Sequence, residues 1–361
     1  MELIPGLPDD IARECLIRVD FEDFPVVEST CRNWRAEIHQ PEFSRRRKAV
    51  GYSQNLIVLT QARVQPGSDL GTRTKYLAAP TYRLSVFEPA TGNWSELNPD
   101  FGQSDKQLPM FCQLVRVGSD LIVLGGWNPM TWTASNSVFI YNFVRATWRC
   151  GADMPGVPRS FFACAASDCD RMVFVAGGHD DQKNALRSAM AYDVVRDEWV
   201  PMPDMGRERD ESKGTFHRGM FHVIGGYSTD MQGQFESSAE AFDVSAWQWG
   251  QVHEEFFKAG TCPRTCVSGE DGLLYMCRAG EVVALKDGTW KVIATLPNEV
   301  KEITYVLTWQ GNLLVIGSPR FVEKVASLSA SLQATVSVPG FVGSSFLVLG
   351  LVVVEVVMGF V

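Results

Sequence analysis

A short apolar run that ends in a Gly-Gly pair occurs three times in this chain. The copies are LIVLGGWNP at 121–129, VFVAGGHDD at 173–181 and FHVIGGYST at 221–229. Their second glycines, Gly126, Gly178 and Gly226, are separated by 52 and then 48 residues (178 − 126 and 226 − 178). A period of this length indicates a repeat architecture. The pattern therefore predicts equivalent structural units that stack on one another.

A second signature has the same period. An aromatic residue is followed seven positions later by Trp in four places: Phe87 and Trp94, Tyr141 and Trp148, Tyr192 and Trp199, Phe242 and Trp249. Between the glycine pairs and the aromatic pairs, short apolar runs are separated by turn residues, which is typical of short β-strands joined by turns. We expect the aromatic pairs to wedge between neighbouring sheets. We expect positive φ or close backbone packing at the glycine pairs: Gly125, Gly126, Gly177, Gly178, Gly225 and Gly226.

Gly-Gly followed by spaced Tyr and Trp resembles the kelch repeat, most strongly over residues 111–250. The resemblance implies a mainly β fold, a six-bladed kelch β-propeller over residues 49–342, because radial stacking of four-stranded sheets leaves only short edges. Runs that suit a second strand begin near 56, 121, 172, 220, 273 and 313, which gives six blades. Only five first strands precede them, so the ring has to be closed from elsewhere.

The C-terminal segment 343–361 departs from the kelch pattern and contains neither Trp nor Tyr. Three interpretations remain open: a strand from Gly343 to Leu351 that closes the first blade, a membrane anchor, and an altered reading of the gene. The apolar stretch 346–361 is shorter than the about twenty residues that span a bilayer, and Glu355 interrupts it. We therefore favour the closing strand, with Val352 to Val361 surplus and prone to aggregation.

Residues 7–43 break the β pattern and are typical of helices. Asp9 is placed to cap a first helix, and Pro25 suits the first turn of a second, which Pro41 ends. Each helix carries an apolar stripe: Ile11, Cys15, Leu16 and Val19 on the first, and Val27, Cys31, Trp34 and Ile38 on the second. A module this short is poorly stable alone, so we expect a partner.

Leu7-Pro8 at the start of the first helix, STCRNWR with Trp34, and Phe43 resemble an F-box over residues 1–48. The resemblance implies docking on a Skp-type adaptor, which bridges to the cullin and RING subunit of an SCF ubiquitin ligase. It also implies the adaptor contacts Leu7, Pro8, Ile11, Leu16 and Phe24. The alternative is a helical cap on the propeller.

An F-box ahead of a kelch array resembles the plant F-box/kelch-repeat proteins. The phrases LPDDIARECLIRV, GSDLIVLGG and RERDESKGTFH are similar to a subgroup that targets phenylalanine ammonia-lyase or type-B cytokinin response regulators. This implies a non-catalytic substrate-recognition subunit that directs a protein target to ubiquitination, with roles in phenylpropanoid metabolism or cytokinin signalling. The alternatives are an actin-binding or membrane-tethered kelch scaffold and a kelch-propeller enzyme.

In kelch rings the loops after the glycine pairs and the loops between blades emerge on one face. We expect the target to bind there, through arginines and aromatic residues that carry interface energy. For the arginines, a salt bridge within a blade is an equally good interpretation. The candidate contacts are Trp127, Asn128, Arg159, His179, Asp180, Asp181, Arg207, Arg209, Lys213 and Tyr227.

Composition narrows the function classes further. A net charge of −9 and a pI near 5.2 argue against a general nucleic-acid binder. Nine cysteines and an acidic start without a signal peptide favour free thiols in a cytoplasmic and/or nuclear protein. The cysteines and five histidines lack metal-site spacing, and neither a GxSxG nor a P-loop occurs. We therefore expect no metal, no cofactor and no catalytic residues.

Overall fold

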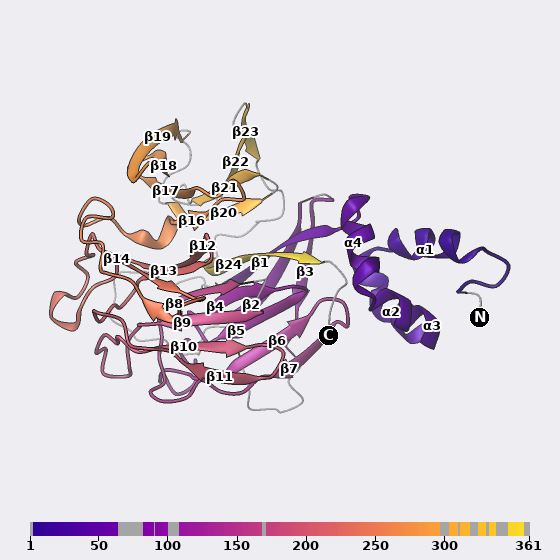
Figure 1. Cartoon of the computed structure of the whole chain (residues 1–361), viewed down its shortest axis with the longest axis horizontal. Coiled ribbons are helices and arrows are strands. Elements are labelled where there is room, and N and C mark those ends of the chain that lie inside the picture. Colours follow the sequence, from indigo (N-terminus) through magenta and orange to yellow (C-terminus); the bar gives the residue numbers. More distant parts are fainter. Residues whose placement is uncertain are drawn as a thin grey trace.

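A computed structural model shows four helices followed by antiparallel sheets (Figure 1). Among the residues that it describes, the strands form six four-stranded sheets. The described residues are 3–63, 82–89, 91–99, 108–167, 171–296, 303–309, 311–317, 324–329, 332–336 and 346–356.

The helical module consists of α1 (Asp9–Ile17), the 3-10 turn η1 (Phe21–Asp23), α2 (Phe24–Thr30), α3 (Arg32–Ile38) and α4 (Pro41–Ala49). The expected second helix is broken at Cys31, whose backbone is extended and whose Sγ accepts a hydrogen bond from Trp34 N. Pro41 begins α4 instead of ending the module, because proline is suited to a helix first turn. The predicted Asp9 cap is also wrong. Pro8 occupies the N-cap, and the Asp9 carboxylate accepts from Leu3 N.

Five of the sheets are simple antiparallel meanders, and in the sixth the C-terminal strand β24 is added beside β1 of the β1–β3 meander. The strand order is given from one edge to the other. The sheets are β24 (Phe346–Val356), β1 (Gln54–Arg63), β2 (Tyr82–Glu88), β3 (Asn93–Leu97); β4 (Gln113–Val117), β5 (Asp120–Leu124), β6 (Val138–Asn142), β7 (Thr147–Cys150); β8 (Ala163–Ser167), β9 (Met172–Ala176), β10 (Ala189–Asp193), β11 (Glu198–Pro201); β12 (Lys213–His217), β13 (Met220–Ile224), β14 (Ala239–Asp243), β15 (Gln248–Trp249); β16 (Val267–Ser268), β17 (Leu274–Arg278), β18 (Glu281–Lys286), β19 (Thr289–Thr295); and β20 (Ile303–Trp309), β21 (Asn312–Gly317), β22 (Lys324–Ser329), β23 (Leu332–Val336).

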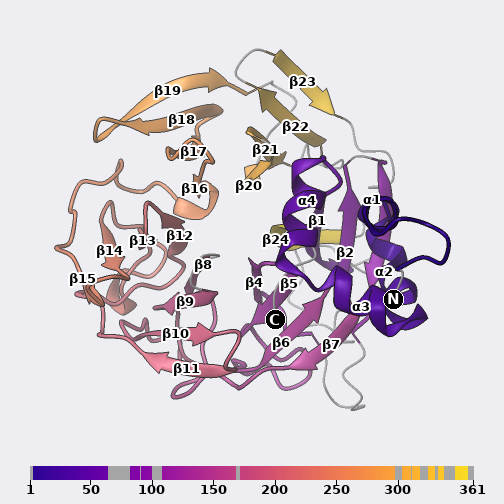
Figure 2. The same ribbon diagram turned by 45° about the vertical axis from the view of Figure 1, so that its right-hand side comes forward.

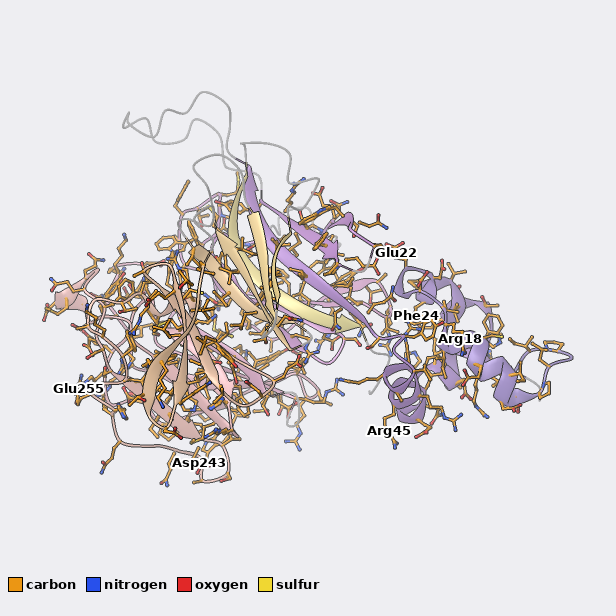
Figure 3. All side chains as sticks on the ribbon, turned by 90° about the horizontal axis from the view of Figure 1, so that it is seen from above. Arg18, Glu22, Phe24, Arg45, Asp243 and Glu255 are labelled. Carbon is orange, nitrogen blue, oxygen red and sulfur yellow. The ribbon has the colours of Figure 1, made fainter. Side chains whose placement is uncertain are left out.

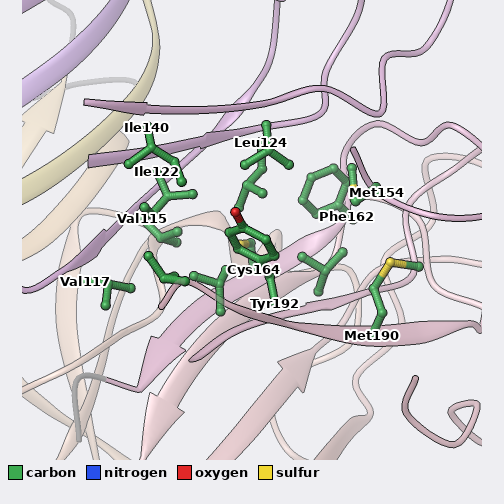
Figure 4. Close-up of a cluster of buried hydrophobic side chains, with 14 residues drawn as sticks. Val115, Val117, Ile122, Leu124, Ile140, Met154, Phe162, Cys164, Met190 and Tyr192 are labelled. Carbon is green, nitrogen blue, oxygen red and sulfur yellow. The ribbon is translucent and has the colours of Figure 1, made fainter. Parts of the chain in front are cut away.

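The sheets lie around a circle, with one edge strand of each turned toward the centre (Figure 2). These inner strands are spatial neighbours in the sequence β24, β4, β8, β12, β16, β20, and β20 lies next to β24 again. The β part of the chain is therefore a propeller. Apolar side chains fill the space between adjacent sheets, as in the cluster of Val115, Ile122, Phe162 and Tyr192 between the β4–β7 and β8–β11 sheets (Figure 4).

The glycine pairs have the predicted backbone. All six glycines have positive φ, from 56° at Gly125 to 93° at Gly126. A Cβ on the second glycine of each pair would collide with a carbonyl oxygen of the neighbouring loop, that of Ser160 in the case of Gly178. A strand that must bring its end this close to another backbone has room only for glycine.

The aromatic pairs also have the predicted role. The rings of Tyr192 and Trp199 pack 5.0 Å apart, and Trp199 Nε1 donates to Ala152 O in the connection from the preceding sheet at 2.8 Å. The same bond recurs from Trp249 to Pro203 O at 2.7 Å. Trp199 and Trp249 thus pack partly buried rings against the core between sheets and satisfy their N–H groups across the boundary.

The C-terminal strand β24 pairs antiparallel with β1 and occupies the inner edge of the first sheet. The pairing runs from Phe346 opposite Arg63 to Val356 opposite Gln54. The expectation that the chain beyond Leu351 is surplus is therefore wrong for residues 352–356, which continue the ladder. Residues 337–345, just before β24, and residues 357–361, after it, lie outside the described part.

The helical module is fixed to the propeller at the turn between β6 and β7. Val144 of this turn is packed with Leu16, Phe24 and Ile38 in the core of the module. Because β5 runs into Gly125 and β6 returns antiparallel to it, this turn lies at the opposite end of the strands from the glycine pair. The helices that carry Arg18 and Phe24 extend beyond one side of the sheets (Figure 3).

Candidate functional site

The helical module exposes three large apolar side chains near its start. Leu7, Ile11 and Val26 are 36%, 47% and 64% exposed. Pro8 is exposed as well, and so are the Cys15 and Cys31 thiols. Several exposed large apolar residues on one small module are typical of a protein that docks on a partner. Leu7, Pro8 and Ile11 therefore lie where an adaptor could reach them, and Val26 is a candidate that the sequence interpretation missed.

The other two predicted adaptor contacts lie in the core of the module. Leu16 is 2% exposed and Phe24 is completely buried. The predicted stripe on α1 divides into two faces, because Ala12, Leu16 and Ile17 point into the module while Ile11 and Cys15 point outward. Some apolar residues of α1 form the core of the module, and others face solvent where a partner could dock. Only burial distinguishes these two faces.

A second surface forms where the loops after the glycine pairs meet the loops that enter the inner strands. Residues of the two loops form isolated antiparallel bridges: Met110 with Trp127, Ser160 with His179, and Asp210 with Tyr227. In each bridge the two backbones exchange N–H···O bonds of 2.7 to 3.1 Å. The expectation that both sets of loops share one face is therefore confirmed.

Two predicted target-binding arginines are buried and stabilise the fold. Arg159 is 2% exposed and donates to the carbonyls of Gly177 and Ser188 and to the Ser188 hydroxyl. Arg209 is completely buried and makes the equivalent bonds to Gly225 and Ser238. Because the terminal nitrogens of both guanidinium groups donate to the loop after the glycine pair, these buried arginines hold that loop in place and are unavailable to a target.

The buried Arg209 also pairs with Glu240 at 3.0 Å, and both side chains are almost completely buried. Arg207 lies nearer the surface, 40% exposed, and pairs with Glu236 at 3.2 Å and Glu254 at 2.6 Å. These carboxylates raise the pKa of Arg207, although burial opposes them. The charge of Arg207 is therefore largely neutralised within the fold.

Most of the remaining candidates are also engaged within the loops. Asn128 Oδ1 accepts from the backbone of its own turn, and so does Asp180 Oδ1. Asp181 Oδ1 accepts from Ala134 N of the preceding sheet. His179 and Tyr227 are 5% and 6% exposed, whereas Trp127 and Lys213 are half-buried.

Comparison with known proteins separates the same two parts of the chain, the helical module and the propeller. The F-box domain model matches residues 4–46, and the Kelch motif model matches residues 111–155 and 158–206. The F-box/kelch-repeat protein At1g15670 of Arabidopsis thaliana is 52% identical over 326 residues, which cover 90% of this chain and 90% of that protein. This chain belongs to the F-box/kelch-repeat family.

Other members of the F-box/kelch-repeat family lie at a range of distances. The Arabidopsis protein At1g80440 is 52% identical over 88% of both chains, and At2g44130 is 36% identical over 74% of this chain and 69% of its own. The solved structure of YjhT aligns with a TM-score of 0.55 at 11% identity, covering 70% of this chain and 91% of that one. The last comparison supports the propeller fold alone.

Sequence reasoning missed three residues of this F-box/kelch-repeat protein at the shared loop face. Phe111, Phe161 and Glu211 each immediately precede the approach to an inner strand, and each has a positive φ, of 52°, 55° and 50°. They are spaced by 50 residues (161 − 111 and 211 − 161). That period was visible in the sequence, but their backbone conformation was not.

Within the described part of this F-box/kelch-repeat protein, three or more His, Cys, Asp or Glu side chains are nowhere grouped to hold a metal ion. Burial raises the pKa of the Cys112 and Cys266 thiols to about 12, which leaves them protonated and poorly nucleophilic. Among the described helices, none has the length and apolar character to cross a membrane.

Proposed function

We propose that this chain is the substrate-recognition subunit of an SCF-type E3 ubiquitin ligase. Its F-box docks a Skp-type adaptor, which links it to a cullin and a RING subunit, and its kelch propeller holds a protein target. The chain makes no covalent bond itself; it acts by raising the effective concentration of a target lysine near the E2. The supporting observation is that Leu7, Ile11 and Val26 are exposed on a module that has its own buried core, which includes Leu16, Phe24 and Ile38.

The placement of the two surfaces supports the same proposal. The module contacts the β6–β7 turn, at the strand ends opposite the glycine-pair loops. A target on the glycine-pair loops therefore leaves the adaptor surface free. Because Val144 is packed in the module core and Arg47 donates to Gln54 across the junction at 3.1 Å, the two surfaces keep a fixed separation.

The adaptor surface is tested by co-expression with a Skp-type adaptor and pull-down. An Ile11→Glu variant places a charge in the exposed patch without touching the module core, so we expect adaptor binding to fall at least about tenfold, since burying an unpaired charge costs several kcal/mol. Val195→Glu is the matched control, because Val195 is 57% exposed on the propeller. Equal adaptor binding by Ile11→Glu and wild type, or no binding by wild type, would refute the proposal.

For the target we propose phenylalanine ammonia-lyase or a type-B cytokinin response regulator, which would place the chain in phenylpropanoid regulation or cytokinin signalling in the cytoplasm and/or nucleus. The support is the similarity of LPDDIARECLIRV, GSDLIVLGG and RERDESKGTFH to that subgroup. Reconstituted ubiquitin transfer to each purified candidate, with the wild-type chain and with Ile11→Glu, tests the assignment. Transfer that is independent of the chain would contradict it.

We further infer a closed ring of six blades, with residues 1–48 as the F-box and the propeller beginning at 49. The support is the set of six four-stranded sheets among the described residues and the proximity of β20 to β24 and of β24 to β4. In this closed ring β24, which lies within the predicted tail 343–361, is the inner strand of the first blade. Hydrogen exchange tests it: protection of the β24 amides should match that of β4 and β8.

A further inference from the structure

Phe111, Phe161 and Glu211 have a backbone conformation that bulky L-residues avoid. In the left-handed region Cβ approaches the following carbonyl oxygen, which costs free energy at each position. Such conformations persist where the surroundings impose them, and they concentrate at ligand-binding sites. The neighbouring bridges, Met110 with Trp127 and Ser160 with His179, impose this one. Here the strain is repeated in three consecutive sheets at equivalent positions.

The strained backbone brings four rings together at the loop face. The Phe111 and Phe161 rings are 5.2 Å apart. Phe161 stacks on His179 at 5.3 Å, and Trp127 lies 6.0 Å from the same imidazole. We name Phe111, Trp127, Phe161 and His179 the aromatic patch. Its three larger members are half-buried, so part of each ring faces solvent.

The third sheet replaces these rings with acidic groups. Glu211 stands at the position of Phe111 and Phe161, and the Asp210 carboxylate lies 2.8 Å from His179 Nδ1. We assign the proton to Nδ1, which donates to Asp210, so that Nε2 is an acceptor. Nε2 is buried and has no hydrogen-bond partner among the described residues. The patch therefore borders on acceptors and negative charge.

The nearby arginines pair with carboxylates other than that of Glu211. Arg209 forms an ion pair with Glu240, and Arg207 forms ion pairs with Glu236 and Glu254. Lys213, two residues after Glu211, lies near Cys164 of β8 and Cys266 just before β16, and burial lowers its pKa. Burial, and then the nearby Asp210 and Glu211 carboxylates, raise the pKa of Tyr227, so its hydroxyl carries no charge.

We infer that the aromatic patch together with Glu211 is the docking point for a segment of the protein target that carries an arginine next to an aromatic residue. The arginine plane stacks on exposed ring faces and pairs with the Glu211 carboxylate. The aromatic residue packs against Phe111 and Phe161. This inference rests on the proposed function, since it names the chemistry of the target that the propeller holds.

The test is fluorescence polarisation with the full chain and fluorescein-labelled twelve-residue Gly/Ser peptides. One peptide has Phe-Arg at its centre, one has Phe-Glu and one has Ala-Arg. We expect the Phe-Arg peptide to bind about tenfold or more tightly than either of the others, which corresponds to about 1.4 kcal/mol. Equal affinities for the three peptides, or no binding of any of them, would overturn the inference.

Two variants locate the peptide on the patch. Glu211→Gln removes the charge while keeping the size of the side chain, and it should weaken the Phe-Arg peptide about fivefold or more without changing the melting temperature. Phe111→Ala should weaken it as well. Glu255→Gln is the control, because Glu255 is an exposed acid in the segment after β15, and affinity should stay at the wild-type value. Unchanged affinity in Glu211→Gln would refute the docking point.

The outcome is separable from that of the proposed function. If Glu211→Gln still binds the adaptor and supports ubiquitin transfer to a target at the wild-type rate, the ligase role stands and the docking point is wrong. If adaptor binding fails in the wild-type chain while the Phe-Arg peptide binds selectively, the docking point stands and the ligase role is wrong.

Discussion

Arg47 Nη2 of α4 donates to Gln54 Oε1 in the first residue of β1 at 3.1 Å, across the junction between the helices and the propeller. The same guanidinium donates to the carbonyls of Ile17 and Val19 and lies 4.6 Å from the Phe24 ring centroid. Gln54 in turn donates to Glu88 of β2. Burial lowers the pKa of Arg47 to about 10, with Asp20 opposing the shift. One buried cation thus joins α1, α4 and the first sheet.

Replacing Arg47 with Met should loosen this junction. The variant leaves the Ile17 and Val19 carbonyls without their donor, at a cost of about 2–4 kcal/mol. Limited proteolysis should then cleave the segment 50–53 faster, and the melting temperature should fall. Arg45→Met is the matched control, because Arg45 lies on the same helix with its side chain 72% exposed. Similar proteolysis of both variants would show that Arg47 does not hold the junction.

Arg209→Met tests the structural role assigned to the buried arginine. It removes the partner of Glu240 and leaves that carboxylate buried, which should lower the free energy of unfolding by about 3–5 kcal/mol. Arg207→Met should cost about 1 kcal/mol or less, because its ion pairs are solvent-exposed. Thermal denaturation of the two variants side by side provides the measurement. A larger effect for Arg207 would contradict the assignment.

Gly178→Ala and Gly156→Ala separate backbone conformation from close packing. Both glycines have nearly the same φ, 82° and 80°, but a Cβ at Gly156 meets nothing within 4 Å, whereas one at Gly178 collides with Ser160 O. We expect about 1 kcal/mol of destabilisation at Gly156. Gly178→Ala should cost about 1–3 kcal/mol more. If the two melting temperatures fell equally, close packing would not be the reason for the second glycine.

His222 makes the stability of the β12–β15 sheet depend on pH. Burial, and then the neighbouring His217, lower the pKa of His222 from 6.5 to about 4, and its Nε2 is buried without a partner among the described residues. The unfolded chain therefore takes up the proton first, so the stability present above pH 6.5 is lost as the pH falls toward 4. His222→Gln should remove up to about 2 kcal/mol of this loss.

The measurement is the melting temperature between pH 7.5 and 4.5. The exposed His253 provides the control, and His253→Gln should follow the wild-type curve. A wild-type curve that was flat over this range would exclude the role of His222.

Truncation distinguishes the two halves of β24. Residues 352–356 pair with Gln54 to Val58 of β1, so ending the chain at Leu351 exposes part of an inner edge that should aggregate. Ending it at Val356 keeps every described pair. We expect the chain that ends at Leu351 to give less monomer in size-exclusion chromatography, and the chain that ends at Val356 to match wild type. More soluble monomer from the Leu351 truncation would show that the ladder beyond Leu351 is dispensable.

The sequence by itself determined the repeating unit of this protein, its helical start and its family. Gly-Gly and the spaced aromatic pairs are local requirements: Gly178 meets a backbone that excludes Cβ, and Trp199 needs an acceptor in the preceding connection. Such constraints recur with the period and can be read from one chain.

Only the tertiary structure decided which side chains face a partner. Leu16 and Ile11 belong to one apolar stripe, and Arg207 and Arg209 to one charged segment, yet one member of each pair is buried and the other reaches solvent. Burial depends on what a neighbouring element brings to the same place, such as Val144 against the helices or Glu240 against Arg209. Those contacts join residues far apart in the chain, so no local pattern encodes them.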